Sequence, residues 1–132
     1  MSPYRALAGL LLIIALSLAD PGSAAAITSD EFLLRSGADV VALCATPASD
    51  PLYTAAVHMC HGFGAGIYQT MTALMRHDKI ASVVCPPNPV PTRNETVERF
   101  VSWAKRNPQQ LPQPAAETVA RFFMSEFPCQ PR

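Results

Sequence analysis

Four cysteines constrain this chain more than any other feature of its 132-residue sequence, and they stand at Cys44, Cys60, Cys85 and Cys129. All four follow an N-terminal leader that is typical of export, and an even number of cysteines in a small exported chain predicts two disulfides. No two of them have the C-x-x-C spacing of a zinc knuckle or a thioredoxin-like redox centre. We therefore expect a small domain held by two disulfides, and the count alone leaves three pairings open.

The leader occupies residues 1–26. Met1 to Arg5 is a short positive segment, and residues 6–19 are an uninterrupted run of apolar and small residues. Ala24 to Ala26 then supplies the small side chains that signal peptidase accepts. The apolar run of 14 residues is shorter than the ~20 residues that span a bilayer. The pattern predicts a secretory signal peptide that is removed near Ala26, which leaves residues 27–132 as a single domain.

The composition excludes two classes of partner. Ten basic and ten acidic residues give a formal net charge of zero. A nucleic-acid-binding protein shows a basic surplus, and a neutral chain has no electrostatic attraction to an acidic membrane. Hydrophobic residues make up 49% of the chain, which is too many for a disordered protein. We expect a folded protein that binds neither nucleic acid nor, once the leader is removed, a membrane.

Apolar periodicity and capping signals predict helices throughout the mature chain. Thr28 with Glu31, and Thr92 with Glu95, have capping-box spacing. Gly37 weakens the middle of the first helix and is a point where that helix can break. No stretch alternates as a strand does. The sequence predicts an all-α fold, a small disulfide-stapled bundle of about four main helices near residues 29–45, 51–76, 92–107 and 114–127, with a proline-rich connector at 77–91.

The expected order of helices favours one disulfide pairing. A short turn joins the first two helices, which should lie antiparallel, and this brings Cys44 and Cys60 together on their inward faces. Cys85 precedes the third helix and Cys129 follows the fourth, so an antiparallel hairpin returns these two residues to the same side. We expect the pairs Cys44–Cys60 and Cys85–Cys129.

No set of residues assembles into an active site. His58 and His61 lie three positions apart on the second helix, but no carboxylate has the spacing that would complete a metal site. A cysteine in a disulfide is not a nucleophile, and no glycine-rich phosphate loop follows a strand. We predict a binding or structural protein with no catalytic residue, no metal site and no cofactor.

Three glycines, Gly62, Gly64 and Gly66, interrupt the second helix, and each costs about 1 kcal/mol there relative to alanine. Gly62 and Gly66 lie with Ala55 on one flank of the apolar stripe. This placement predicts that the backbone of a neighbouring helix packs closely against them. The alternative is a ligand cleft lined by bare backbone.

Segment 60–66, CHGFGAG, resembles the C-x-G-[YF]-x-x-G core of the Rap/Tai family, the amidase-immunity proteins of type VI secretion. The similarity covers about residues 32–129, and it includes Cys44, Cys85 with Pro87, Trp103 before Asn107-Pro108, and the terminal Phe127-Pro128-Cys129. Two positions depart from the family pattern. Asn107 replaces a common histidine, and Gly64 is an additional glycine.

The resemblance implies a periplasmic, mostly helical, often dimeric protein that binds and inhibits a toxic peptidoglycan amidase and catalyses nothing. The matched residues belong to the scaffold, so they do not identify the partner. The alternative hypothesis is a general envelope-stress or chaperone-like periplasmic protein with no dedicated amidase partner. Such a chaperone would expose apolar surface at low pH, whereas a disulfide-stapled inhibitor would not.

An inhibitor of an amidase places a rigid protrusion in or over a concave site. The stiffest non-helical segment is Ile80 to Pro91, which its prolines hold extended and Cys85 tethers. Trp103 lies about 110° from the centre of the third helix's apolar stripe by helical phase, and we expect it to be only partly buried. The candidate partner interface is Val90, Arg93, Glu95, Glu98, Arg99 and Trp103, and the next candidate is the face of the second helix that bears His58 and His61.

Overall fold

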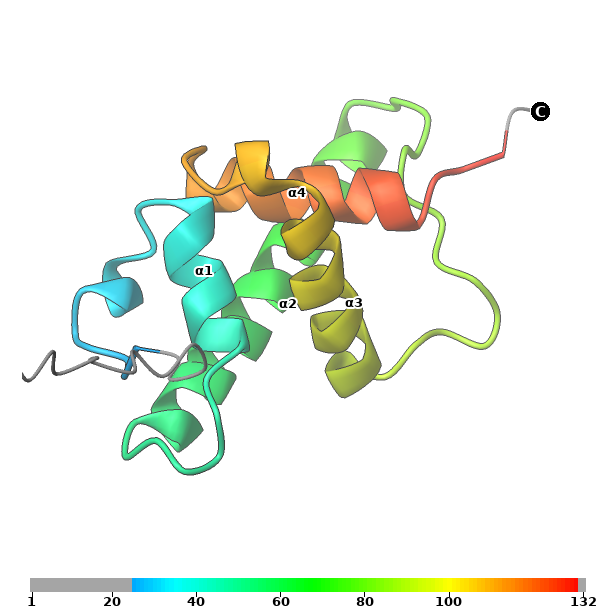
Figure 1. Cartoon of the computed structure of the whole chain (residues 1–132). Helices are drawn as coiled ribbons and strands as arrows, with labels where there is room; N and C mark the ends of the chain where they lie inside the picture. The colour runs from blue at the N-terminus through cyan, green and yellow to red at the C-terminus, as the bar shows by residue number, and fades with distance from the viewer. Residues whose placement is uncertain (1–24, 131–132) are drawn as a thin grey trace, which may run out of the picture.

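The computed structural model describes residues 25–130. Within them are four α-helices, α1 (Gly37–Cys44), α2 (Tyr53–His77), α3 (Arg93–Arg106) and α4 (Ala115–Glu126), two 3-10 turns, η1 (Glu31–Leu33) and η2 (Pro108–Gln110), and no β-strand (Figure 1). The predicted all-α fold class is confirmed. The predicted leader lies outside the described residues apart from its last two alanines. No helix in residues 25–130 is both long and apolar enough to cross a membrane.

Helix α4 crosses the other three helices and closes the core. Helices α1 and α2 pack together, α3 contacts both, and α4 contacts all three (Figure 1). Aromatic rings fill the region where α3 meets α4. Phe122, at the centre of this cluster, has its ring centroid 5.2 Å from that of Phe100 and 6.1 Å from that of Phe127, both in edge-to-face geometry, which aromatic pairs prefer.

Trp103 belongs to this core, so the prediction that it is only partly buried is wrong. Its side chain is 5% exposed, and its ring centroid lies 5.8 Å from that of Phe122. The indole Nε1–H donates a hydrogen bond to Ser125 Oγ at 3.1 Å. The physical reason is that α4 covers a second side of α3, beyond the stripe that the α3 periodicity indicates.

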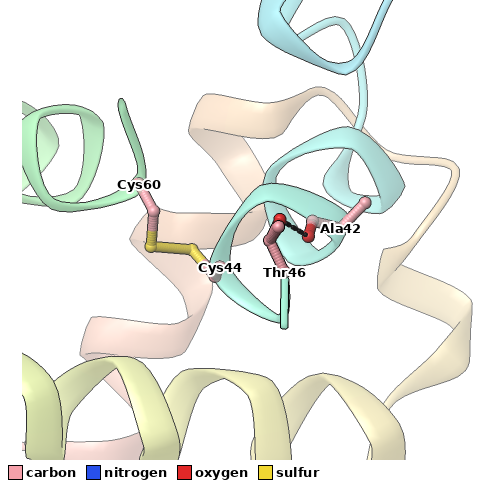
Figure 2. Close-up of a disulfide and its surroundings, with 4 residues drawn as sticks. All are labelled: Ala42, Cys44, Thr46 and Cys60. Atoms are coloured by element: carbon pink, nitrogen blue, oxygen red, sulfur yellow. Dashed lines mark hydrogen bonds between the residues drawn. A yellow bond between two sulfur atoms is a disulfide. The ribbon is translucent and has the colours of Figure 1, made fainter. Parts of the chain in front are cut away.

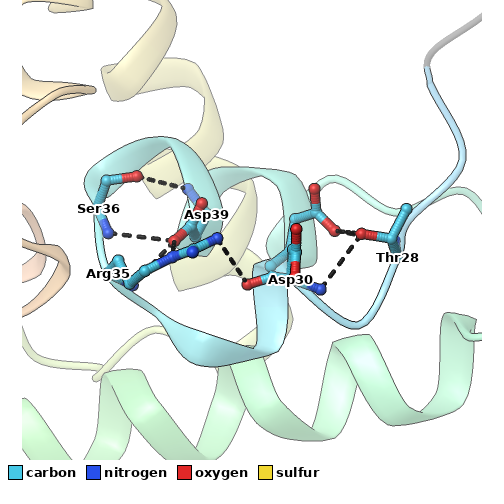
Figure 3. A network of polar contacts seen from close by, with 6 residues as sticks. Thr28, Asp30, Arg35, Ser36 and Asp39 are labelled. Atoms are coloured by element: carbon cyan, nitrogen blue, oxygen red, sulfur yellow. Dashed lines mark hydrogen bonds and ion pairs between the residues drawn. The ribbon is translucent and has the colours of Figure 1, made fainter.

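The first helix is shorter than predicted. Thr28 N and Oγ1 both donate to Glu31 Oε2 at 2.8 Å, as the capping spacing suggested, but this contact stabilises only the turn η1. The turn ends at Leu34, which has a left-handed φ of 50°. A second capping box then begins α1, with Ser36 Oγ accepting from Asp39 N while Asp39 Oδ2 accepts from Ser36 N (Figure 3).

Gly37 explains why α1 begins where it does. It is buried, and its N–H donates to Gln113 O at 2.7 Å. A Cβ at this position would lie 2.5 Å from Thr118 Oγ1 and 2.6 Å from the carbonyl oxygen of Gln110. The start of α1 therefore packs against the entry to α4 at a distance that only glycine permits.

Both disulfides form with the expected pairing. Cys44–Cys60 joins the end of α1 to α2 with a Cα–Cα distance of 5.2 Å (Figure 2). Beside it the hydroxyl of the buried Thr46 donates to Ala42 O at 2.9 Å, which closes the end of α1. Cys85–Cys129 joins the connector to the segment after α4, with a Cα–Cα distance of 4.8 Å.

The connector between α2 and α3 is anchored at its centre. Val84 forms an isolated antiparallel bridge with Pro128, and Cys85 N donates to Phe127 O at 2.7 Å. Together with the disulfide, these contacts hold residues 84–85 against the end of α4. From this anchor residues 86–91 lead to Thr92, the N-cap of α3.

Gly62 and Gly66 do not pack against a neighbouring helix of this chain, so that prediction is wrong. Both are exposed, and a Cβ at either position would meet no atom within 4 Å. The inward face of α2 is carried instead by Ala56 and Cys60, its two buried residues. The two glycines lie on one flank of the apolar stripe of α2. The other helices of the described chain pack on the side of α2 that faces away from these glycines.

Candidate functional site

A groove of about 280 Å³ opens between α2, the connector and the first turns of α3. Three elements that are distant in sequence therefore form one concave surface. Its lining residues are Cys60, His61, Gly64, Ala65, Tyr68 and Gln69 of α2, Pro86, Val90 and Pro91 of the connector, Arg93, Thr96 and Val97 of α3, and Phe123 and Phe127.

The base of the groove belongs to the aromatic core. Phe123 and Phe127 are buried, and the ring of Tyr68 packs on Phe123 with centroids 5.4 Å apart. Cys60, which is 4% exposed, ties this region to α1 through its disulfide. Because these groups are fixed by the core, the groove exists before any ligand arrives.

Gly64 opens the groove at its α2 wall. A Cβ at Gly64 would meet no atom within 4 Å, so the missing side chain leaves free space rather than relieving a clash. A smaller apolar cavity of about 40 Å³ shares Cys60, Gly64, Thr96, Val97 and Phe123 with the groove. The small cavity therefore adjoins the groove at Gly64.

Arg93 supplies the charge of the groove. It is the only Lys, Arg, Asp or Glu among the described lining residues. It has no carboxylate within ion-pair distance among residues 25–130. The neighbouring Glu95 carboxylate is engaged by Thr92, whose N–H and hydroxyl lie 2.7 Å and 2.8 Å from Oε2. The groove is thus an apolar recess beside an unpaired cation.

A second, shallower depression of about 400 Å³ lies along the outer face of α3, lined by Glu95, Glu98, Arg99, Ser102, Arg106 and Glu126. Arg106 and Glu126 form an ion pair across it at 3.6 Å. The Arg99 guanidinium carbon lies 6.0 Å from the ring centroid of Phe127, close enough for a cation–π contact. Hydrogen bonds from the Thr92 N–H and hydroxyl lower the pKa of Glu95.

The predicted partner interface divides between these two surfaces. Val90 and Arg93 line the groove, whereas Glu95, Glu98 and Arg99 line the charged depression. Trp103 is in the core and reaches neither of them. Tyr68 and Val97 also line the groove, and the sequence assigned neither of them to a site.

The two histidines of α2 lie in different surroundings. His61 lines the groove, while His58 is exposed on the outer face. Within the described residues no group of three His, Cys, Asp or Glu side chains is placed to hold a metal ion. The described residues thus form an apolar recess with a cation at its edge and an anchored connector beside it.

A family model described as Rap1a immunity proteins matches residues 36–129. The match begins at the N-cap of α1 and ends at Cys129, so it includes all four helices and both disulfides. No curated protein and no solved structure matches the chain.

Proposed function

Because this chain belongs to the Rap1a immunity protein family, we propose that it binds a peptidoglycan amidase effector of a type VI secretion system and inhibits it in the periplasm. Membership confirms the Rap/Tai resemblance and implies immunity to a type VI effector, a role without catalysis. The two disulfides and the family together indicate an exported protein. The match across all four helices is the observation that carries the proposal.

The connector and the adjacent start of α3 are the surface that we propose for inhibition. Val90 is 71% exposed and Ile80 is 60% exposed, although both lie in a segment that the Cys85–Cys129 disulfide and the Phe127 hydrogen bond anchor. A protrusion that is already ordered loses little conformational entropy when it binds. This combination of exposure and anchoring suits a segment that enters an enzyme's cleft.

Arg93, Glu95, Glu98 and Arg99 extend this surface along α3, where all four are exposed. Trp103, buried in the core, is no longer part of it. A mixed set of charges at the edge of an interface contributes more to the rate and specificity of association than to affinity. We expect the connector to supply most of the binding energy and the α3 charges to orient the partner.

The experiment uses a type VI peptidoglycan amidase sought among the genes that neighbour the one for this chain, because immunity proteins protect against a dedicated effector. Purified protein should abolish hydrolysis of peptidoglycan by that enzyme at equimolar concentration. Val90→Asp and Arg99→Glu should each weaken inhibition, whereas Arg121→Glu, on the exposed face of α4 in an i,i+4 pair with Glu117, is the matched control. Undiminished hydrolysis in the presence of wild-type protein would contradict the proposal.

Two further parts of the proposal have separate readouts. We propose that a signal peptide is removed near Ala26, leaving residues 27–132 as one domain, and an intact mass of the periplasmic protein tests this. We also propose a homodimer, which sedimentation velocity tests. The chaperone hypothesis predicts that the protein binds a hydrophobic dye and prevents aggregation of unrelated proteins at low pH, which an inhibitor with two disulfides should not do.

A further inference from the structure

We propose that the groove between α2 and α3 receives an apolar side chain of the partner protein that stands next to a carboxylate. This inference rests on the proposed function and adds the chemistry of the segment that docks. In the complex, a side chain of the partner then lies in the groove of this chain, while the connector of this chain lies in the cleft of the partner.

The size of the groove indicates what it can hold. Pockets for drug-sized ligands and cofactors measure about 300–1,000 Å³, whereas this groove has about 280 Å³ and adjoins a cavity of only about 40 Å³. The volume suits one or two side chains of a protein loop. A cofactor would be too large for this groove to enclose.

The walls of the groove select an apolar side chain. Val90, Pro91 and Val97 line it on the side of the connector and α3, and Ala65 and Tyr68 line it on the side of α2. The adjoining cavity adds Val40, Cys44, Phe100, Val119 and Phe122, and Thr96 is the only side chain with a hydroxyl, amide or charged group among its described lining residues. A side chain that passes Gly64 therefore exchanges water for aliphatic and aromatic contacts, which supply the favourable free energy of burial.

The charge beside the groove selects the neighbouring group. Arg93 lacks an ion-pair partner in the described chain, and no carboxylate lines the groove. A guanidinium presents a planar set of donors that matches a carboxylate with two hydrogen bonds. A lysine or arginine of the partner at this place would be repelled by the positive charge of Arg93, because no carboxylate lines the groove to compensate it. The complementary segment therefore carries aspartate or glutamate next to its apolar residue.

The first experiment fills the groove without disturbing the fold. Gly64→Leu adds a side chain where a Cβ meets no atom within 4 Å, and Gly62→Leu adds the same side chain two residues away on the open face of α2. Both variants remove a helix glycine, so both should be at least as stable as the wild type. We expect Gly64→Leu and Arg93→Glu each to weaken effector binding at least about tenfold. Gly62→Leu should bind as the wild type does, with the oligomeric state of each variant checked by sedimentation. Wild-type affinity in Gly64→Leu would overturn the groove proposal.

The second experiment does not need the effector. A short acetylated peptide with a central leucine flanked by aspartates is titrated into the protein, and amide NMR signals are followed. We expect shifts at Gly64, Ala65 and Val97 that the lysine-flanked peptide does not produce. Equal shifts with both peptides, or none with either, would overturn the proposal. If the wild type fails to bind the amidase but selects the acidic peptide, the proposed function fails while the groove assignment stands.

A separate observation at the N-terminus of the described chain carries a second inference. Ile27 N donates a hydrogen bond to Asp50 Oδ2 at 3.1 Å, and Asp50 Oδ1 accepts from Leu52 N at 2.8 Å. Ile27 also packs against the cluster formed by Leu43, Ala56 and Cys60. We infer that cleavage after Ala26 converts this amide into an ammonium group that forms an ion pair with Asp50.

Cleavage at that bond hydrolyses the Ala26–Ile27 amide, so that Ala26 leaves with the new carboxylate and Ile27 keeps the nitrogen as an amine that takes up a proton. The charge appears on an atom already within hydrogen-bond distance of a carboxylate, which the Leu52 N–H holds in place. Removal of the leader thereby strengthens the contact between the N-terminus and the turn between α1 and α2.

Acetylation of the mature N-terminus tests this ion pair. In the mature protein, acetylation should raise the unfolding equilibrium constant about threefold to fivefold, the effect of a partly exposed ion pair. In the Asp50→Asn variant it should have no effect, and high salt should reduce the difference in the wild type. An equal effect of acetylation in both proteins would overturn the inference, as would a mature chain that begins elsewhere.

Discussion

Replacing Gly37 by alanine is the most direct test of how α1 and α4 fit together. On helix propensity alone the substitution should stabilise the protein, because alanine is favoured over glycine by up to about 1 kcal/mol. The structure predicts the opposite. The new Cβ would lie 2.5 Å from Thr118 Oγ1, 2.9 Å from Thr118 Cγ2 and 2.6 Å from Gln110 O, all well inside van der Waals contact.

Neither neighbour of that Cβ can move without loss. Thr118 is 0% exposed, and its hydroxyl donates to Gln110 O at 2.9 Å. Overpacking a filled core costs about 1–3 kcal/mol, and a broken internal hydrogen bond costs about 1 kcal/mol more. After the propensity gain is subtracted, Gly37→Ala should lower the free energy of unfolding by about 1–3 kcal/mol.

Urea unfolding followed by circular dichroism measures this loss. With a slope of about 1–3 kcal/mol per molar urea, the midpoint should fall by roughly 1 M. Gly62→Ala is the matched control, because a Cβ there meets nothing within 4 Å and the midpoint should rise. A Gly37→Ala protein as stable as the wild type would refute the close packing of α1 on the entry to α4.

Four further substitutions test other parts of the structure. Cys129→Ser opens a disulfide with a sequence separation of 44 and should lower stability by ~4 kcal/mol in the chain-entropy model; urea unfolding checks the loss, and thiol labelling should find Cys85 free. Trp103→Ala should lower stability by about 3–5 kcal/mol, as truncation of a buried aromatic does, whereas Val90→Asp should weaken the amidase complex and leave the unfolding midpoint unchanged. The pKa of Glu95 is lowered in the folded state. The stability that its carboxylate contributes is therefore complete above the pKa of an unfolded carboxyl, and it is lost as pH falls through the lower pKa of the folded state. Glu95→Gln should therefore make the unfolding midpoint less sensitive to acid, and a midpoint that falls equally in both proteins would contradict this assignment.

Local chemistry in the sequence was sufficient for much of the fold. The Thr92–Glu95 capping box begins α3, with its reciprocal hydrogen bonds in place, because such a cap depends only on residues three apart. Both disulfide pairs followed from the order of the helices, since short turns leave few ways to arrange neighbouring helices. The proline-rich connector was equally evident, because proline cannot continue a helix.

Tertiary packing decided what those local signals left open. Thr28 and Glu31 make their predicted contact, yet the helix begins only at Gly37, because α4 and the segment before it determine where α1 can pack. Trp103 is buried because α4 covers a second side of α3, which the periodicity of α3 alone does not record. The groove joins residues from α2, the connector and α3. A helix's own sequence specifies which of its faces is apolar, but only the packing of the other helices specifies which atoms meet that face and where a recess remains.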